Sequence, residues 1–132
     1  MVLSGAMVRS VLLIGSRIAL MGALAAVTWS SLAPPDDLPS EIALSDKLLH
    51  GIAYAVLGVV AALAQRRPRV ILTVLLLTAF GLLMEVLQDR TTYRTFDLAD
   101  LYADALGAAI GVVVVAWPMR LAERRRARSD GA

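Results

Sequence analysis

The chain has 132 residues, of which 58% are hydrophobic and only 18% are charged, and its formal net charge is +2. Soluble domains are roughly 45–50% apolar, and a single core of this size could not bury so much apolar surface. The composition therefore excludes an ordinary soluble enzyme and a disordered chain, and it indicates a membrane protein. The sequence has no cysteine, which excludes disulfides and thiol chemistry, and one histidine, which excludes any site that needs two.

Four continuous apolar stretches follow one another along the chain, at residues 11–32, 48–64, 70–87 and 101–117. Each is close to the ~20 residues that a helix needs to cross the hydrocarbon core of a bilayer. The stretches do not alternate as barrel strands do, and helices satisfy their own backbone polar groups in lipid. The sequence thus predicts an all-α membrane protein with one domain over 1–132, a four-helix transmembrane bundle followed by a basic tail over 118–132.

The first stretch has two interpretations. Arg9, the apolar run and Ser31-Leu32-Ala33 together resemble a signal peptide that ends in a small-x-small cleavage site. Because Pro34 would follow the cut directly, we expect cleavage to be blocked and the first helix to be retained. Arg17 lies inside the run, and we expect its long side chain to reach the cytoplasmic headgroups.

The placement of cations predicts the orientation of the bundle. Of the 13 cations, only Lys47, Arg90 and Arg94 lie on the side opposite the termini and the short turn 65–69. By the positive-inside rule we expect both termini in the cytoplasm of a bacterium, with the chain in its inner membrane. Most acids lie toward the outer face: Asp36, Asp37, Glu41, Asp46, Glu85, Asp89, Asp97, Asp100 and Asp104.

The Arg-rich tail, 120–128, has a topological interpretation, in which it holds the C-terminus inside. The alternative is contact with anionic lipid headgroups. We expect no nucleic-acid binding, because the chain has no domain left to read bases.

Polar side chains recur at the helix ends that reach the outer face. In chain order they are Asp46, Lys47, His50, Tyr54, Glu85, Gln88, Arg94, Asp97, Asp100 and Asp104. Capping explains some of them, since Asp97 can cap the fourth helix while Asp100 reaches back in a capping box. Glu85, His50 and Asp104 lie inside apolar runs, where charge is costly. We therefore expect a polar pocket, with Glu85 facing the interior toward Lys47, His50 or Arg94; the alternative is hydrogen bonding that only holds the helices together.

Small residues form stripes on two of the predicted helices. Gly51 and Ala55 are four residues apart, as are Gly107 and Gly111. Such stripes let helix backbones approach closely. We expect them to pack inside the bundle, and dimerisation is the alternative.

Taken together, these motifs resemble the VanZ-like membrane protein family. The resemblance rests on four motifs in order between residues 46 and 111: Asp46-Lys47-x-x-His50, Glu85-x-x-Gln88, Arg94-x-x-Asp97-x-x-Asp100 and Gly107-x-x-x-Gly111. Asp104 departs from the family pattern, which usually has Asn there, and it adds a negative charge. The resemblance implies a bacterial cell-envelope protein, with antibiotic resistance suggested by the family's namesake, which is associated with teicoplanin. It implies no established reaction.

The function that we expect is that of a VanZ-like envelope protein linked to glycopeptide response or cell-wall precursor handling. Its outer-face pocket would bind a polar envelope ligand or a divalent cation, for which carboxylates suit Mg²⁺ or Ca²⁺, while His50 would titrate near neutral pH. No cofactor is otherwise implied. One alternative is a small intramembrane hydrolase in which His50 is the general base, oriented by Asp46 or Glu85. Another is a structural partner of a larger envelope complex. The sequence leaves open whether the chain is an enzyme and what its oligomeric state is.

Overall fold

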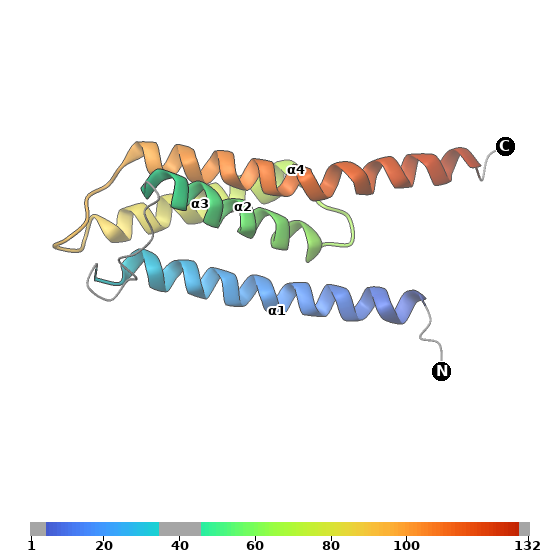
Figure 1. Cartoon of the computed structure of the whole chain (residues 1–132), viewed down its shortest axis with the longest axis horizontal. Helices are drawn as coiled ribbons and strands as arrows, with labels where there is room; N and C mark the ends of the chain where they lie inside the picture. Colours follow the sequence, from blue (N-terminus) through green and yellow to red (C-terminus); the bar gives the residue numbers. More distant parts are fainter. Residues whose placement is uncertain (1–4, 35–45, 130–132) are drawn as a thin grey trace.

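A computed structural model describes residues 5–34 and 46–129 as a bundle of helices, with no strand among them. The four helices are α1 (Gly5–Leu32), α2 (Asp46–Leu63), α3 (Val70–Gln88) and α4 (Leu98–Ser129). They run alternately up and down, so the start of α1, the α2–α3 turn and the end of α4 lie at one end of the bundle (Figure 1). All four are long and apolar enough to cross a membrane, which confirms the predicted fold class.

Two helices are longer than their apolar stretches. The first begins at Gly5 rather than at residue 11, and α4 runs from Leu98 through Pro118 to Ser129. The extra residues include Arg9 in α1 and Glu123 with five arginines in α4, so the continuous apolar stretches stop short of them. They continue the helix because arginine, alanine, leucine and glutamate favour helical backbone in water as well as in lipid. The predicted basic tail is therefore helical as far as Ser129.

Close backbone contact joins α2 to α4. A Cβ atom on Gly107 would overlap the carbonyl oxygen of Gly51, and a Cβ atom on Gly111 would overlap that of Ala55. Gly58, which the sequence analysis does not single out, continues the contact, since its Cβ would lie 2.5 Å from the carbonyl oxygen of Ala108. Glycine at these positions allows the two backbones to approach without a side chain between them.

The buried core lies among α2, α3 and α4. It consists of Tyr54, Leu57, Ala61, Ala62, Leu77, Ala108 and Val112. By contrast, α1 contributes only partly buried side chains such as Leu20, Leu24 and Val27, which pack against this core from outside. Large apolar side chains elsewhere point away from the bundle, as Ile18 and Ile71 do, and such a surface suits lipid rather than water.

Candidate functional site

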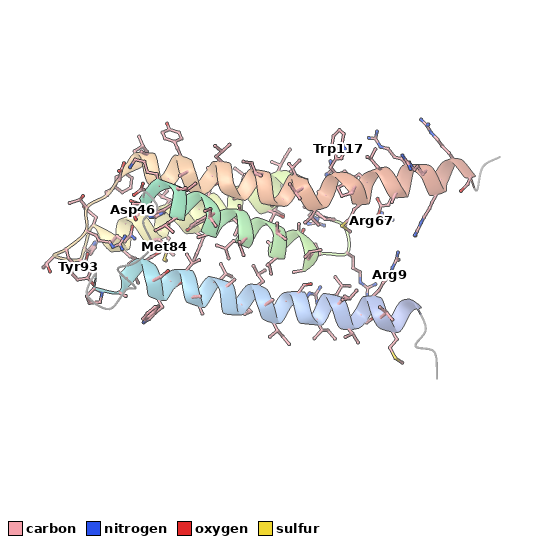
Figure 2. The ribbon with its side chains drawn as sticks, viewed as in Figure 1. Arg9, Asp46, Arg67, Met84, Tyr93 and Trp117 are labelled. Atoms are coloured by element: carbon pink, nitrogen blue, oxygen red, sulfur yellow. The ribbon has the colours of Figure 1, made fainter. Side chains whose placement is uncertain are left out.

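The predicted polar residues gather at the end of the bundle opposite the chain termini. This end is formed by the start of α2, the end of α3 and the start of α4. Figure 2 shows Asp46 and Tyr93 here, whereas Arg9 and Arg67 lie toward the other end. The alternating direction of the helices produces this separation of acids from most arginines.

The outer part of the cluster is an ion-pair link between α2 and α4. The Lys47 ammonium lies 2.6 Å from Asp97 Oδ2 and 3.1 Å from Asp100 Oδ1. Asp97 also caps α4, because its Oδ1 accepts a hydrogen bond from the backbone N–H of Ala99 at 2.8 Å. The hydrogen bond from Lys47, and then that from Ala99, holds the pKa of the Asp97 carboxyl below its ordinary value of 3.8.

The inner part of the cluster contains His50, Glu85 and Asp104. His50 Nδ1 and Asp104 Oδ1 share a hydrogen bond of 2.9 Å, and Asp100 Oδ2 lies 3.9 Å from His50 Nε2. Glu85 and Asp104 are each only 1% exposed. One potential ligand atom from each of His50, Glu85 and Asp104 lies within 4.8 Å of the other two. Three helices therefore supply groups that could hold one metal ion.

A second group of potential ligands overlaps the first. Asp46, His50 and Asp100 also bring one ligand atom each to within 4.8 Å of one another. Asp46 is exposed, so this second group lies nearer the surface of the bundle. Since His50 belongs to both groups, the two arrangements are parts of one cluster.

Glu85 connects α3 to the start of α4, but not as the sequence analysis predicts. Its carboxylate lies in the interior, as expected, and Oε2 accepts a hydrogen bond from the backbone N–H of Asp97 at 2.9 Å. Of the expected partners, Lys47 and Arg94 make no ion pair with Glu85 among the described residues, whereas His50 lies beside it, with a ring nitrogen within 4.8 Å of a Glu85 carboxylate oxygen. The predicted capping box is also wrong. The Asp100 carboxylate was expected to accept a hydrogen bond from the backbone N–H of Asp97, but that N–H donates to Glu85, and Asp100 accepts from Lys47 instead.

Two buried polar atoms of the cluster have no hydrogen-bond partner among the described residues, namely Glu85 Oε1 and Tyr54 Oη. Tyr54 is 2% exposed. Glu85 belongs to the inner part of the cluster, and Tyr54 lies near it, since a Cβ built on Gly81 would lie 2.8 Å from Asp104 Oδ2 and 3.3 Å from Tyr54 Oη. The lack of a side chain at Gly81 leaves space for the Asp104 carboxylate and the Tyr54 hydroxyl. Gly81 is absent from the predicted site, although its position one turn before Glu85 was a usable signal.

Other predicted site residues lie outside this arrangement. Gln88 is buried and donates a hydrogen bond from Nε2 to the carbonyl oxygen of Ser31 at 3.0 Å, so it connects α3 to α1. Arg94 makes no ion pair with the acids in the described part of the chain. The predicted outer acids Asp36, Asp37 and Glu41 fall outside the described residues.

The cluster has more acids than bases. Its carboxyl groups are those of Asp46, Glu85, Asp97, Asp100 and Asp104, and its basic groups are those of Lys47 and His50. Lys47 is already paired with Asp97, the cap of α4, and with Asp100 in its first turn. The cluster therefore carries an excess of acidic over basic groups.

Comparison with known proteins agrees with the motif-based prediction. The family model described as VanZ/LLP1 matches residues 8–119, which include every residue of the polar cluster and of the α2–α4 contact. No curated protein and no solved structure matches the chain. The four apolar helices and the extent of this match lead to one assignment: the chain belongs to the VanZ/LLP1 family.

Proposed function

We propose that this VanZ/LLP1 family member is an inner-membrane protein of the bacterial cell envelope that binds a divalent cation, Mg²⁺ or Ca²⁺, at the polar cluster. In this proposal the cluster faces the outside and the termini face the cytoplasm. The bound cation would complete a pocket for a polar envelope ligand, consistent with a role in cell-wall precursor handling or glycopeptide response.

The observation that carries the proposal is the buried, half-paired carboxylate of Glu85. Its Oε1 has no partner among the described residues, and neither has the buried Tyr54 hydroxyl. A buried polar group without a hydrogen bond is costly, and a carboxylate inside a membrane helix is more so. A cation bound between Glu85 and Asp104 would remove this cost, with Tyr54 as a further oxygen donor.

Charge supports the same conclusion. Glu85 and Asp104 come from different helices and are both buried, yet the one ammonium at this end is bound to Asp97 and Asp100. His50 is hydrogen-bonded to Asp104, and among the described residues no lysine or arginine forms an ion pair with Glu85. Hard divalent cations prefer carboxylate oxygens, and the number of charged ligands sets their affinity.

Direct metal binding tests this proposal. The full chain in nanodiscs is titrated with Mn²⁺, whose free-ion signal is followed by electron paramagnetic resonance, and with Mg²⁺ or Ca²⁺ as competitors. We expect one saturable site, and we expect Glu85→Gln to weaken binding on the order of tenfold or more. Asp89→Asn is the matched control, because Asp89 is an exposed acid at the same end of α3.

Two results would contradict the cation site. One is the absence of saturable Mn²⁺ binding to the wild-type chain, and the other is equal loss of affinity in the Glu85 and Asp89 variants. A chain that binds no metal but is destabilised by Glu85→Gln would favour the structural alternative. The cross-helix hydrogen bonds of Lys47 and Glu85 are the observation that supports that alternative.

Reporter fusions test the proposed orientation independently of metal binding. Fusions at Arg67 and after Arg128 are expected to be active in the cytoplasm, and a fusion near Asp37 outside it. A reporter at Arg67 that is active outside the cytoplasm would overturn this topology.

A further inference from the structure

A second potential binding site lies away from the polar cluster, between α1 and the other helices. It is a partly open cavity of about 460 Å³. Its walls are mainly apolar and come from three helices, with Leu20 and Leu24 on α1, Ala61 on α2, and Leu76 and Phe80 on α3. A cavity with such walls between membrane helices suits a hydrocarbon chain rather than a polar molecule.

We call this cavity the α1 groove. It exists because α1 is hydrogen-bonded to the rest of the bundle at two places along its length and packs only lightly between them. At one level, Arg17 Nε donates a hydrogen bond to the carbonyl oxygen of Ala64 at 3.3 Å. At the other, Gln88 and Tyr93 donate to the carbonyl oxygens of Ser31 and Leu32. Between these anchors, none of the described α1 side chains is fully buried.

Most of the polar groups along the groove are satisfied internally. Gln65 Nε2 donates to the carbonyl oxygen of Ala61 and to Thr73 Oγ1, both at 2.9 Å. Arg17 is different, because it is the charged side chain among the described lining residues. Its hydrogen bond to Ala64 places it level with the end of α2, and the described residues supply no partner for its Nη atoms.

We infer that this groove binds one anionic phospholipid, with an acyl chain along the apolar walls and the phosphate on the Arg17 guanidinium. Arginine matches phosphate because its planar group offers parallel N–H donors. Arg66, Arg67 and Arg69 follow the end of α2 and add positive charge at the same level. Basic pockets between membrane helices are a known setting for anionic headgroups.

A second copy of the chain fits this end of the bundle less well. At this end of the bundle, the acid that α4 supplies among the described residues is Glu123. Its Oε1 already lies 3.7 Å from Arg67 Nε. Another copy would therefore bring mostly further arginines toward Arg17, and like charges repel. Charge complementarity favours an anionic lipid over self-association.

Native mass spectrometry of the full, delipidated chain in detergent tests the inference. The probes are phosphatidylglycerol and phosphatidylcholine with identical acyl chains, each added separately. We expect the wild-type chain to bind one phosphatidylglycerol with a preference of about fivefold over phosphatidylcholine. Arg17→Gln should reduce this preference to near one, and Arg17→Lys should retain only part of it, because the charge is kept but the parallel N–H donors are lost.

Two further variants separate this site from general effects. Arg9→Gln is the matched control, since Arg9 is an arginine on the same helix that does not line the groove. It should leave the preference unchanged. Leu24→Trp places a larger side chain in the groove and should lower binding of both lipids, with thermal unfolding used to verify that the variant folds.

Several outcomes would overturn the inference. Equal binding of the two lipids by the wild-type chain would exclude recognition of the headgroup charge, and an equal effect of Arg9→Gln and Arg17→Gln would exclude a specific role for Arg17. Displacement of the lipid by millimolar inorganic phosphate would assign the site to free phosphate. A dimer signal that Leu24→Trp abolishes would assign the groove to a second copy.

Discussion

Two helices pack beside α2, and they do so in contrasting ways. The α4 backbone approaches α2 through Gly107 and Gly111, so closely that neither position has room for a Cβ atom. In α1, Gly15 and Gly22 have nothing within 4 Å of where a Cβ would lie. The same residue type thus serves close packing in one helix and has no packing role in the other.

The contrast shows which property decides membrane insertion and which decides assembly. Both helices are apolar enough to cross a bilayer, but lipid is as apolar as the side chains, so hydropathy does not bring helices together. Small residues on matching faces do, because they allow extensive contact between backbones. In consequence the polar cluster is built on α2, α3 and α4, and α1 leaves a groove at its side.

The largest effect is expected at the tight contact. Gly111→Leu would place a side chain against the backbone carbonyl of Ala55, where no flexible group can move away. We expect a loss of about 3 kcal/mol or more in the free energy of unfolding, or failure to assemble. Thermal unfolding in detergent, followed by circular dichroism, measures it. A stable, native-like Gly111→Leu variant would contradict the close α2–α4 approach.

A smaller effect is expected where α3 is connected to α4. Glu85→Ala removes the acceptor of the Asp97 N–H, whereas Glu85→Gln keeps an oxygen in its place. With a chelator present to remove any bound metal, the free energy of unfolding of Glu85→Ala should be lower than that of Glu85→Gln by about 1–3 kcal/mol. Glu123→Ala, an exposed acid on α4, is the control and should differ little from wild type. Equal stability of the two Glu85 variants would show that this hydrogen bond contributes nothing.

The α2–α4 ion pairs should contribute less than the Glu85 hydrogen bond. Lys47 is 53% exposed, and its pairing with Asp97 is screened by water and salt. We expect Lys47→Met to lower the unfolding temperature less than Glu85→Ala does, and the loss to shrink at high salt. A loss that salt leaves unchanged would show that packing, rather than charge, is the main contribution of Lys47.

The ionisation of Asp97 makes the stability of the bundle weakly dependent on pH. Its pKa in the folded chain lies below the ordinary value of 3.8, so its contribution to stability is present above that value and is lost as the pH falls through the lower, folded pKa. The difference in unfolding temperature between wild type and Asp97→Asn should therefore be larger at neutral pH than in strong acid. A difference that stays constant would show that the stabilisation does not depend on the charge of Asp97.

The smallest effect is expected on α1. Gly15→Leu enters open space and should change the free energy of unfolding by less than about 0.5 kcal/mol. It is the direct counterpart of Gly111→Leu, with the same residues exchanged. If the two variants were equally damaging, the contrast between the helices would be wrong.

Sequence by itself determined the number of helices, the family and the residue types at the polar end. Hydropathy and motif spacing are local properties, and a bilayer leaves helices as nearly the only way to satisfy the backbone of such stretches. The Gly107 and Gly111 spacing also indicated close packing before any partner was known. The start of α1 and the end of α4 were harder to predict, because a helix can continue through charged residues beyond the apolar stretch that hydropathy marks.

Tertiary structure alone decided which polar groups meet. Glu85 and Gln88 lie one turn apart, yet Glu85 faces α4 and Gln88 faces α1. Arg94 shares a motif with Asp97 but makes no ion pair with it in the described part of the chain. These differences depend on the rotation and spacing of neighbouring helices, which no single helix encodes. The physical reason is that a helix face is local, whereas a binding site requires several faces brought to the same depth by packing.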